Sequence, residues 1–134
     1  MPHDDDNSLT GVWNGRYSYP SILPPVSFVA TLIETKTRLS GSTHEANAGV
    51  GAAGAIAFAI LDGARSGSRV TFTKTYENVP ADANHAVHYV GTISTDGTEI
   101  SGHWNIPGHW SGNFVMIRAQ RQAIAAKRRS AARA

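Results

Sequence analysis

The chain has 134 residues, 16% of them charged, no cysteine and a formal net charge of +2. This length suits one domain that buries roughly two thirds of the surface its unfolded form exposes, and the lack of cysteine excludes disulfides and thiolate metal sites. Since no apolar run approaches the roughly 18 residues of a membrane span and the acidic N-terminus is unlike a secretory signal, we expect a cytoplasmic protein with no membrane partner.

Eight short segments after the acidic N-terminus carry apolar or aromatic side chains at alternate positions, as Trp13, Tyr17 and Tyr19 do in the first. Alternation with a period of two predicts β-strands of a sheet with one buried face. In chain order the predicted strands are Leu9 to Tyr19, Val26 to Thr35, Arg38 to Glu45, Gly54 to Asp62, Arg69 to Tyr76, His85 to Ser94, Glu99 to Ile106 and Gly112 to Ala119.

The connections between these strands are short and carry turn-forming residues. Asp96-Gly97 is the strongest hairpin signal, because this pair supplies the positive φ angles of a tight turn. Tight turns between consecutive strands favour an antiparallel up-and-down meander. Closure into a barrel would protect both edges of the sheet, and strand glycines such as Gly15, Gly91 and Gly102 would permit the bending. We therefore predict an all-β, eight-stranded antiparallel up-and-down barrel, with a two-sheet sandwich as the alternative.

The first and last strands carry a further signal in Gly11-Val12-Trp13 and Arg118. Together they resemble the calycin superfamily, which contains lipocalins, avidins and fatty-acid-binding proteins. The resemblance implies a structural role for Gly11, Trp13 and Arg118, with the arginine packed over the indole at one end of the barrel. No avidin-like set of biotin contacts can be aligned, and the loop after the first strand has no room for a helical lid.

A second, shorter resemblance concerns Tyr19-Pro20-Ser21-Ile22, which is similar to a motif of haem-binding nitrobindins. That family holds haem through a histidine on the last strand. Asn113 to Gln122 contains no histidine, so haem is disfavoured and no cofactor is expected.

The interior of an eight-stranded barrel is either filled by side chains or holds one small ligand. Unpaired charges are unfavourable in a dry core, whereas apolar walls with a few polar groups are typical of small-molecule sites. If Trp13 and Phe28 face inward, strict alternation also turns inward Tyr17, Tyr19, Tyr76, Tyr89, Trp104, Lys74 and Glu45. We predict a ligand pocket lined by Tyr17, Phe28, Phe58, Phe72, Tyr76, Tyr89, Trp104, Lys74 and Glu45.

Alternatives remain open for the polar members of this set. A β-bulge would shift Glu45 or Lys74 outward, or the two would neutralise each other across the barrel mouth. The tyrosines would then lie at the rim with their hydroxyls in water.

Two loops indicate where the pocket opens. Pro20 to Pro25 is stiffened by proline and projects Ile22 and Leu23, whereas Ala46 to Gly54 is almost wholly glycine and alanine. In an up-and-down barrel both loops fall at the same end, which we take as the mouth, with Ile22 and Leu23 as lid residues. The rival interpretation makes Ile22 and Leu23 the contact of a homodimer.

Six histidines raise the question of metal binding. His85 and His88 are three residues apart and face opposite sides of a strand, and His44 faces away from Glu45. No His-x-His pair and no zinc-protease motif occurs, so no metal site is expected. No nucleophile motif or phosphate-binding loop is present either.

The basic charge gathers at the C-terminus, where five basic residues follow Ala119, while Asn7 to Arg118 holds seven basic and seven acidic residues. A nucleic-acid partner is therefore not expected for the barrel. We expect an acidic disordered segment over residues 1–8, one barrel domain over 9–119, and a basic tail over 120–134 that is a short helix or disordered.

These features favour a protein that binds a small apolar or aromatic molecule without transforming it, with Lys74 and Glu45 orienting a polar end. One alternative is an enzyme that uses Glu45 or Lys74, at a shifted pKa, as acid or base in the same cavity. Another is an oligomeric interaction module joined through Ile22 and Leu23.

Overall fold

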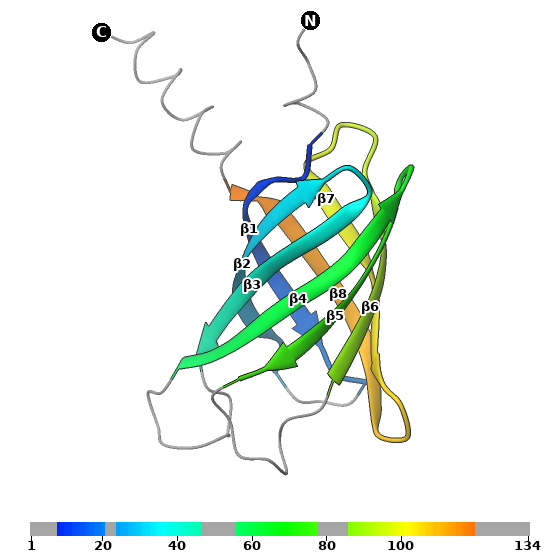
Figure 1. Cartoon of the computed structure of the whole chain (residues 1–134). Helices are drawn as coiled ribbons and strands as arrows, with labels where there is room; N and C mark the ends of the chain where they lie inside the picture. Colours follow the sequence, from blue (N-terminus) through cyan, green and yellow to red (C-terminus); the bar gives the residue numbers. More distant parts are fainter. Residues whose placement is uncertain (1–7, 21–23, 47–55, 78–85, 120–134) are drawn as a thin grey trace, which may run out of the picture.

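Eight antiparallel strands form a closed barrel in which each strand pairs with its neighbours in sequence and β1 pairs with β8 (Figure 1). The structure is a computed structural model, and it describes residues 8–20, 24–46, 56–77 and 86–119. The strands are β1 (Gly11–Ser18), β2 (Val26–Thr35), β3 (Arg38–Ala46), β4 (Ile56–Ser66), β5 (Arg69–Tyr76), β6 (Ala86–Ile93), β7 (Glu99–Ile106) and β8 (Trp110–Arg118). The predicted up-and-down barrel is confirmed, and the sandwich alternative is wrong.

The predicted bounds hold for β2, β5 and β7 and differ by one to four residues elsewhere. The largest difference is at β4, which continues past the predicted end to Ser66. Gly63 stays in the ladder opposite Phe72, so it does not end the strand. The regular pairing runs to Ser66 and Arg69, at the tight turn that follows.

Glycines let large rings lie directly against the inner wall. A Cβ added to Gly15 would lie 2.2 Å from the ring of Phe28. A Cβ added to Gly112 would lie 1.9 Å from the carbonyl oxygen of Ser18 and 2.8 Å from the indole of Trp104. These glycines are therefore needed for close packing, which is one of the reasons that glycine occurs inside strands.

Trp13 and Arg118 close the end of the barrel at which β1 begins and β8 ends. The guanidinium carbon lies 4.6 Å from the centre of the indole, and Trp13 and Arg118 also face each other in the β1–β8 ladder. Arg118 Nη2 donates a hydrogen bond of 2.7 Å to the Ser8 carbonyl, and Nε donates one of 3.2 Å to the Gly97 carbonyl. The predicted contact of Arg118 with the indole of Trp13 is confirmed.

The interior next to this closure is apolar and closely packed. Its side chains are almost completely inaccessible to solvent, and they include Leu9, Trp13, Leu32, Leu39, Leu61, Val70, Ile100 and Met116. This half of the barrel is therefore filled by its own residues and supplies hydrophobic stabilisation.

The opposite end is where β1 and β3 finish and where β2 and β4 begin (Figure 1). The prediction that the two unusual loops join strands at one shared end is thus confirmed by the strand directions. Ile22 and Leu23 lie outside the described residues, and their role as a lid stays a prediction. No helix in the described ranges is long and apolar enough to cross a membrane.

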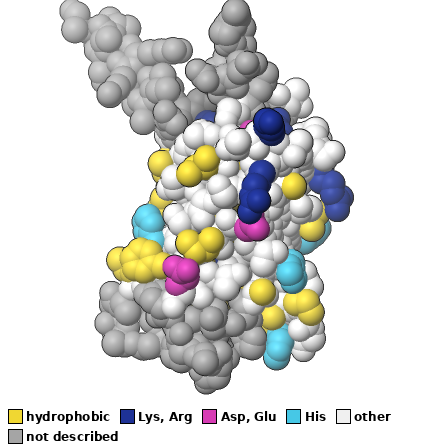
Figure 2. All heavy atoms as spheres, viewed as in Figure 1, with side chains coloured by type: hydrophobic (Ala, Val, Ile, Leu, Met, Phe, Trp, Pro, Cys, Tyr) yellow, Lys and Arg dark blue, Asp and Glu magenta, His cyan; other side chains and the backbone are white. Residues whose placement is uncertain are grey.

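Phe58 was predicted to face inward, and this prediction is wrong. Phe58 is 50% exposed on the outer face of β4, between the equally exposed Ile56 and Ile60. The alanines of the strand face the interior, where Ala57 lies opposite Glu45 and Ala59 lies opposite Tyr76. The small alanine side chains leave space in the interior for Glu45 and Tyr76. On the outer face of β4, Ile56, Phe58 and Ile60 are exposed and add to the hydrophobic side chains of the molecular surface (Figure 2).

Replacing Arg118 tests how the barrel is closed. Arg118→Lys keeps the charge but loses the planar stacking and the forked hydrogen bonds, so we expect the free energy of unfolding in urea to fall by about 2 kcal/mol or more. The matched control is Arg69→Lys at an exposed position on β5, which should change it by less than about 0.5 kcal/mol. Equal stability of Arg118→Lys and the unaltered chain would contradict this closure.

Candidate functional site

A buried ion pair lies inside the other half of the barrel. Lys74 on β5 and Glu45 on β3 both face inward, and Lys74 Nζ lies 3.1 Å from Glu45 Oε1. Their side chains are only 1% and 4% exposed. On the strand between them, β4, Ala57 lies opposite Glu45 and Leu61 lies opposite Lys74, and both face the interior. The predicted inward orientation of both residues is confirmed, without a bulge.

Two tyrosines complete the hydrogen bonding of the carboxylate. Tyr17 Oη donates a hydrogen bond of 2.5 Å to Glu45 Oε2, and Tyr76 Oη donates one of 2.9 Å to Glu45 Oε1. Both carboxylate oxygens are therefore occupied, one by Tyr17 and the other by Tyr76 and Lys74. The tyrosine hydroxyls turn toward the carboxylate instead of lying free in water.

Four aromatic rings surround the ammonium group of Lys74. Its Nζ lies 4.7 Å from the ring centre of Tyr17, 5.1 Å from Phe28, 5.0 Å from Tyr76 and 5.4 Å from Tyr89. Distances below about 6 Å are those of cation–π interactions, which are strongest where water is excluded. We call Lys74, Glu45 and these four rings the lysine box.

Burial shifts the protonation equilibria of the box. It lowers the pKa of Lys74 below the usual 10.5, although the carboxylate of Glu45 partly opposes this effect. Burial raises the pKa values of Tyr17, Tyr76 and Tyr89 above the usual 10.0, and the negative charge of Glu45 adds to the effect. The phenols are thus held in their neutral form as hydrogen-bond donors.

An aromatic wall continues from the box. The rings of Phe72 and Tyr89 stack with centres 4.8 Å apart, and Phe114 meets Tyr89 edge-on at 4.9 Å. Phe72, Tyr89 and Trp104 are buried, so their predicted inward orientation is confirmed. Phe114 was not among the predicted pocket residues, although the alternation of Phe114 and Met116 on the last strand could have identified it.

Thr43 is a second residue that the sequence prediction missed. It faces inward on β3, two positions before Glu45, and is 2% exposed. Its hydroxyl is buried without a hydrogen-bond partner among the described residues. Such a group is unfavourable unless a water molecule or a ligand satisfies it. The alternation of Gly41, Thr43 and Glu45 places it on the inner face, but only the structure reveals the missing partner.

Aromatic side chains also lead outward from the box at this end. Tyr17 meets Trp104 edge-on at 5.9 Å, Trp104 meets Tyr19 at 5.4 Å, and Tyr19 meets Trp110 at 5.7 Å. Tyr19 is half-buried, and Trp110 is 46% exposed. The four rings form a continuous path from the barrel interior to its surface, which we call the aromatic path.

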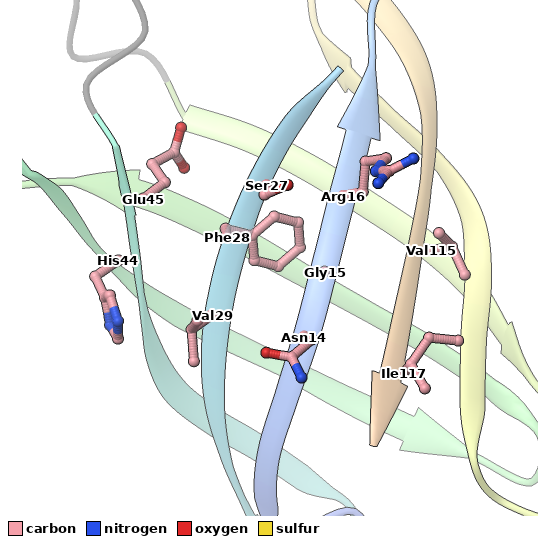
Figure 3. Close-up of a pocket in the computed structure, with 10 residues that line it drawn as sticks. All are labelled: Asn14, Gly15, Arg16, Ser27, Phe28, Val29, His44, Glu45, Val115 and Ile117. Atoms are coloured by element: carbon pink, nitrogen blue, oxygen red, sulfur yellow. The ribbon is translucent and has the colours of Figure 1, made fainter. Parts of the chain in front are cut away.

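The outer wall near the box carries a hollow of about 620 Å³ (Figure 3). It lies over β8, β1, β2 and β3, and its lining consists of Asn14, Gly15, Arg16, Ser27, Phe28, Val29, His44, Glu45, Val115 and Ile117. Most of these are outward-facing, but Phe28 and Glu45 belong to the lysine box. Gly15, which has no side chain and lies against the ring of Phe28, also lines the hollow.

The described histidines lie on the outer surface and in a turn, away from the box. His44 lies beside Phe58 with ring centres 6.4 Å apart, His88 pairs with Thr73 at 3.2 Å, and His103 pairs with Asn113 at 2.8 Å. Within the described ranges, no group of three or more histidine, aspartate, glutamate or cysteine side chains could hold a metal ion. His85 lies outside those ranges.

Comparison with known proteins gives no family for this sequence: no family model matches it, and no curated protein matches it. The closed barrel of eight antiparallel strands is consistent with a calycin-like fold.

The chain has four tyrosines, and their ionisation tests the lysine box directly. Tyr17, Tyr76 and Tyr89 keep their protons in the folded state above pH 10.0, whereas unfolded tyrosines lose them. The stability that these tyrosines contribute is therefore present below pH 10.0 and falls as the pH rises above it. Lys74, whose pKa is lowered by folding, makes the free energy of unfolding increase with pH, but only up to pH 10.5. We expect tyrosinate absorbance to rise together with the loss of β-sheet circular dichroism.

The contrary result would be a folded barrel in which these tyrosines titrate near pH 10. Tyr17→Phe serves as the control. It should lower the final tyrosinate absorbance by the contribution of one tyrosine, and it should weaken the decline of stability at alkaline pH because one buried phenol is removed.

Proposed function

We propose that the protein is a calycin-like binding protein for a small apolar or aromatic molecule that carries a polar oxygen group. The observation that supports this best is the lysine box at the end of the barrel opposite the Trp13–Arg118 closure. Replacing a buried ion pair by packed apolar residues is often neutral or stabilising. The presence of Lys74 and Glu45 is therefore better explained by ligand recognition than by stability.

The hydrogen-bonding capacity of Lys74 supports a ligand oxygen at this place. An ammonium group has three N–H donors, and Lys74 makes one hydrogen bond to an oxygen of a described residue, Glu45 Oε1. Its other close neighbours are ring faces. A carbonyl or carboxylate oxygen would use the remaining donors, and the buried hydroxyl of Thr43 offers a second polar group on the same inner surface.

The position of the box supports entry from this end. Glu45 is one residue from the end of β3, and Tyr76 is the last residue of β5. Tyr76 and Tyr19 are half-buried, so the polar layer lies directly below the barrel mouth. The aromatic path from Trp110 to Tyr17 would guide an aromatic molecule inward, and Ile22 and Leu23 remain the predicted lid.

Two sources of free energy would act on such a ligand. Apolar walls contribute on the order of 25 cal/mol per Å² of buried surface, which accounts for most of the affinity. The ion pair contributes selectivity, because a ligand without an oxygen group would leave the ammonium without an added partner.

An enzyme that uses the same cavity is the second candidate, and the lowered pKa of Lys74 favours it. A lysine with a lowered pKa is neutral for a larger fraction of the time, and only the neutral amine can act as a general base toward a substrate. A homodimer or interaction module joined through Ile22 and Leu23 also stays a prediction.

Tryptophan fluorescence tests the binding proposal. Titration with a fatty acid, a flavonoid and a tetrapyrrole should give saturable quenching for at least one of them. Trp104→Phe combined with Trp110→Phe should remove most of the signal, since the remaining Trp13 is buried at the other end. Phe28→Leu, inside the box, should weaken binding by about tenfold, the equivalent of roughly 1.4 kcal/mol.

Phe58→Leu is the matched control, because it makes the same substitution on the outer face and should leave the affinity unchanged. Absence of saturable quenching with every probe, together with no co-purified molecule in native mass spectrometry, would refute the proposal.

A further inference from the structure

We infer that Lys74 captures aldehydes covalently, forming a protonated Schiff base inside the barrel. This inference rests on the proposed function, since the aldehyde must first enter the barrel interior, and it specifies the ligand class as aromatic or conjugated aldehydes. The lysine box supplies three groups that the reaction needs. Lys74 is the amine, Glu45 is a proton acceptor in contact with it, and the four aromatic rings stabilise the cationic product.

The amine and its proton acceptor are in direct contact. Glu45 Oε1 lies 3.1 Å from Lys74 Nζ, so the carboxylate can take a proton from the ammonium without an intervening group. Burial, which lowers the pKa of Lys74, favours this transfer. The hydroxyls of Tyr17 and Tyr76 bond to the same carboxylate and hold it in place.

The reaction balances without an oxidant or a reductant. Glu45 first takes one proton from the ammonium, and the free nitrogen lone pair forms a bond to the carbonyl carbon while the carbonyl π electrons move to oxygen. A nitrogen proton then moves to that oxygen, which gives a neutral carbinolamine. Protonated Glu45 donates its proton to the hydroxyl, water leaves, and the nitrogen lone pair forms the C=N bond. The products are a protonated Schiff base, the Glu45 carboxylate and one water molecule.

The lysine box stabilises the positive charge of this product by the same contacts that stabilise the ammonium group. The iminium nitrogen keeps the positive charge beside Glu45, and the rings of Tyr17, Phe28, Tyr76 and Tyr89 remain within cation–π distance of its position. An aldehyde conjugated to an aromatic ring would extend from Lys74 toward the aromatic path. The unpartnered hydroxyl of Thr43 gives the departing water or a ligand hydroxyl a place to bond.

The sequence makes the test simple, because the chain has only three lysines: Lys36, Lys74 and Lys127. The unaltered full-length protein is incubated with cinnamaldehyde and sodium cyanoborohydride, digested and mapped by mass spectrometry. Capture predicts a reduced adduct, with the mass of the aldehyde less one oxygen atom, on the peptide containing Lys74. Labelling of Lys74 should exceed that of the exposed Lys36 by on the order of tenfold or more, since the bound aldehyde is held beside the amine.

The failure of this inference can be told apart from the failure of the proposed function. If cinnamaldehyde quenches Trp104 fluorescence saturably but labels Lys36 as much as Lys74, covalent capture is refuted and binding stands. If it neither quenches nor labels Lys74, the inference fails as well, and saturable binding of a fatty acid or flavonoid then decides whether the proposed function survives. Adducts concentrated on Lys74 support capture.

Lys74→Arg provides the variant control. Arginine keeps a positive charge near Glu45 but forms no Schiff base under these conditions, so the variant should lose the reduced adduct in the barrel while Lys36 stays labelled as in the unaltered chain. If a barrel adduct persists in Lys74→Arg, the reactive amine is not Lys74 and the inference is wrong. Should this variant not fold, the site mapping on the unaltered protein still gives the decisive result.

Discussion

The contact between Lys74 and Glu45 lies at the centre of the interior at the end of the barrel opposite the Trp13–Arg118 closure. The two charges lie 3.1 Å apart with almost no solvent exposure. Charges removed from water are costly unless they are paired and hydrogen-bonded, and here Tyr17 and Tyr76 supply the hydrogen bonds while four rings surround the ammonium. The groups that surround this pair therefore satisfy the two charges inside the barrel.

The two halves of the barrel interior differ in chemistry. Where β1 begins and β8 ends, the interior is mostly aliphatic and is closed by Arg118 over Trp13. At the other end the interior is aromatic and polar, and half-buried rings continue to the surface. A rigid closed end with a polar layer under the mouth is an arrangement that suits a ligand with one apolar and one polar part.

Most of the fold could be predicted from the sequence, because alternation and turn chemistry act locally. The orientation of Phe58 could not, since both faces of β4 are apolar and the alternation does not say which one is buried. The choice is made by long-range partners: alanines face inward opposite Glu45 and Tyr76. The inward side of Lys74 and Glu45 followed from the pattern, but their contact, the convergence of the tyrosine hydroxyls and the unpartnered hydroxyl of Thr43 depend on where eight strands meet in space.

A double-mutant cycle between Glu45 and Lys74 tests this account most directly. Glu45→Gln and Lys74→Met should each lower the free energy of unfolding by about 3 kcal/mol or more, because each leaves the other charge buried without its partner. The double variant should be more stable than the sum of the two losses implies, with a coupling of about 2 kcal/mol or more. Losses that add to within about 0.5 kcal/mol would contradict the central role of this pair.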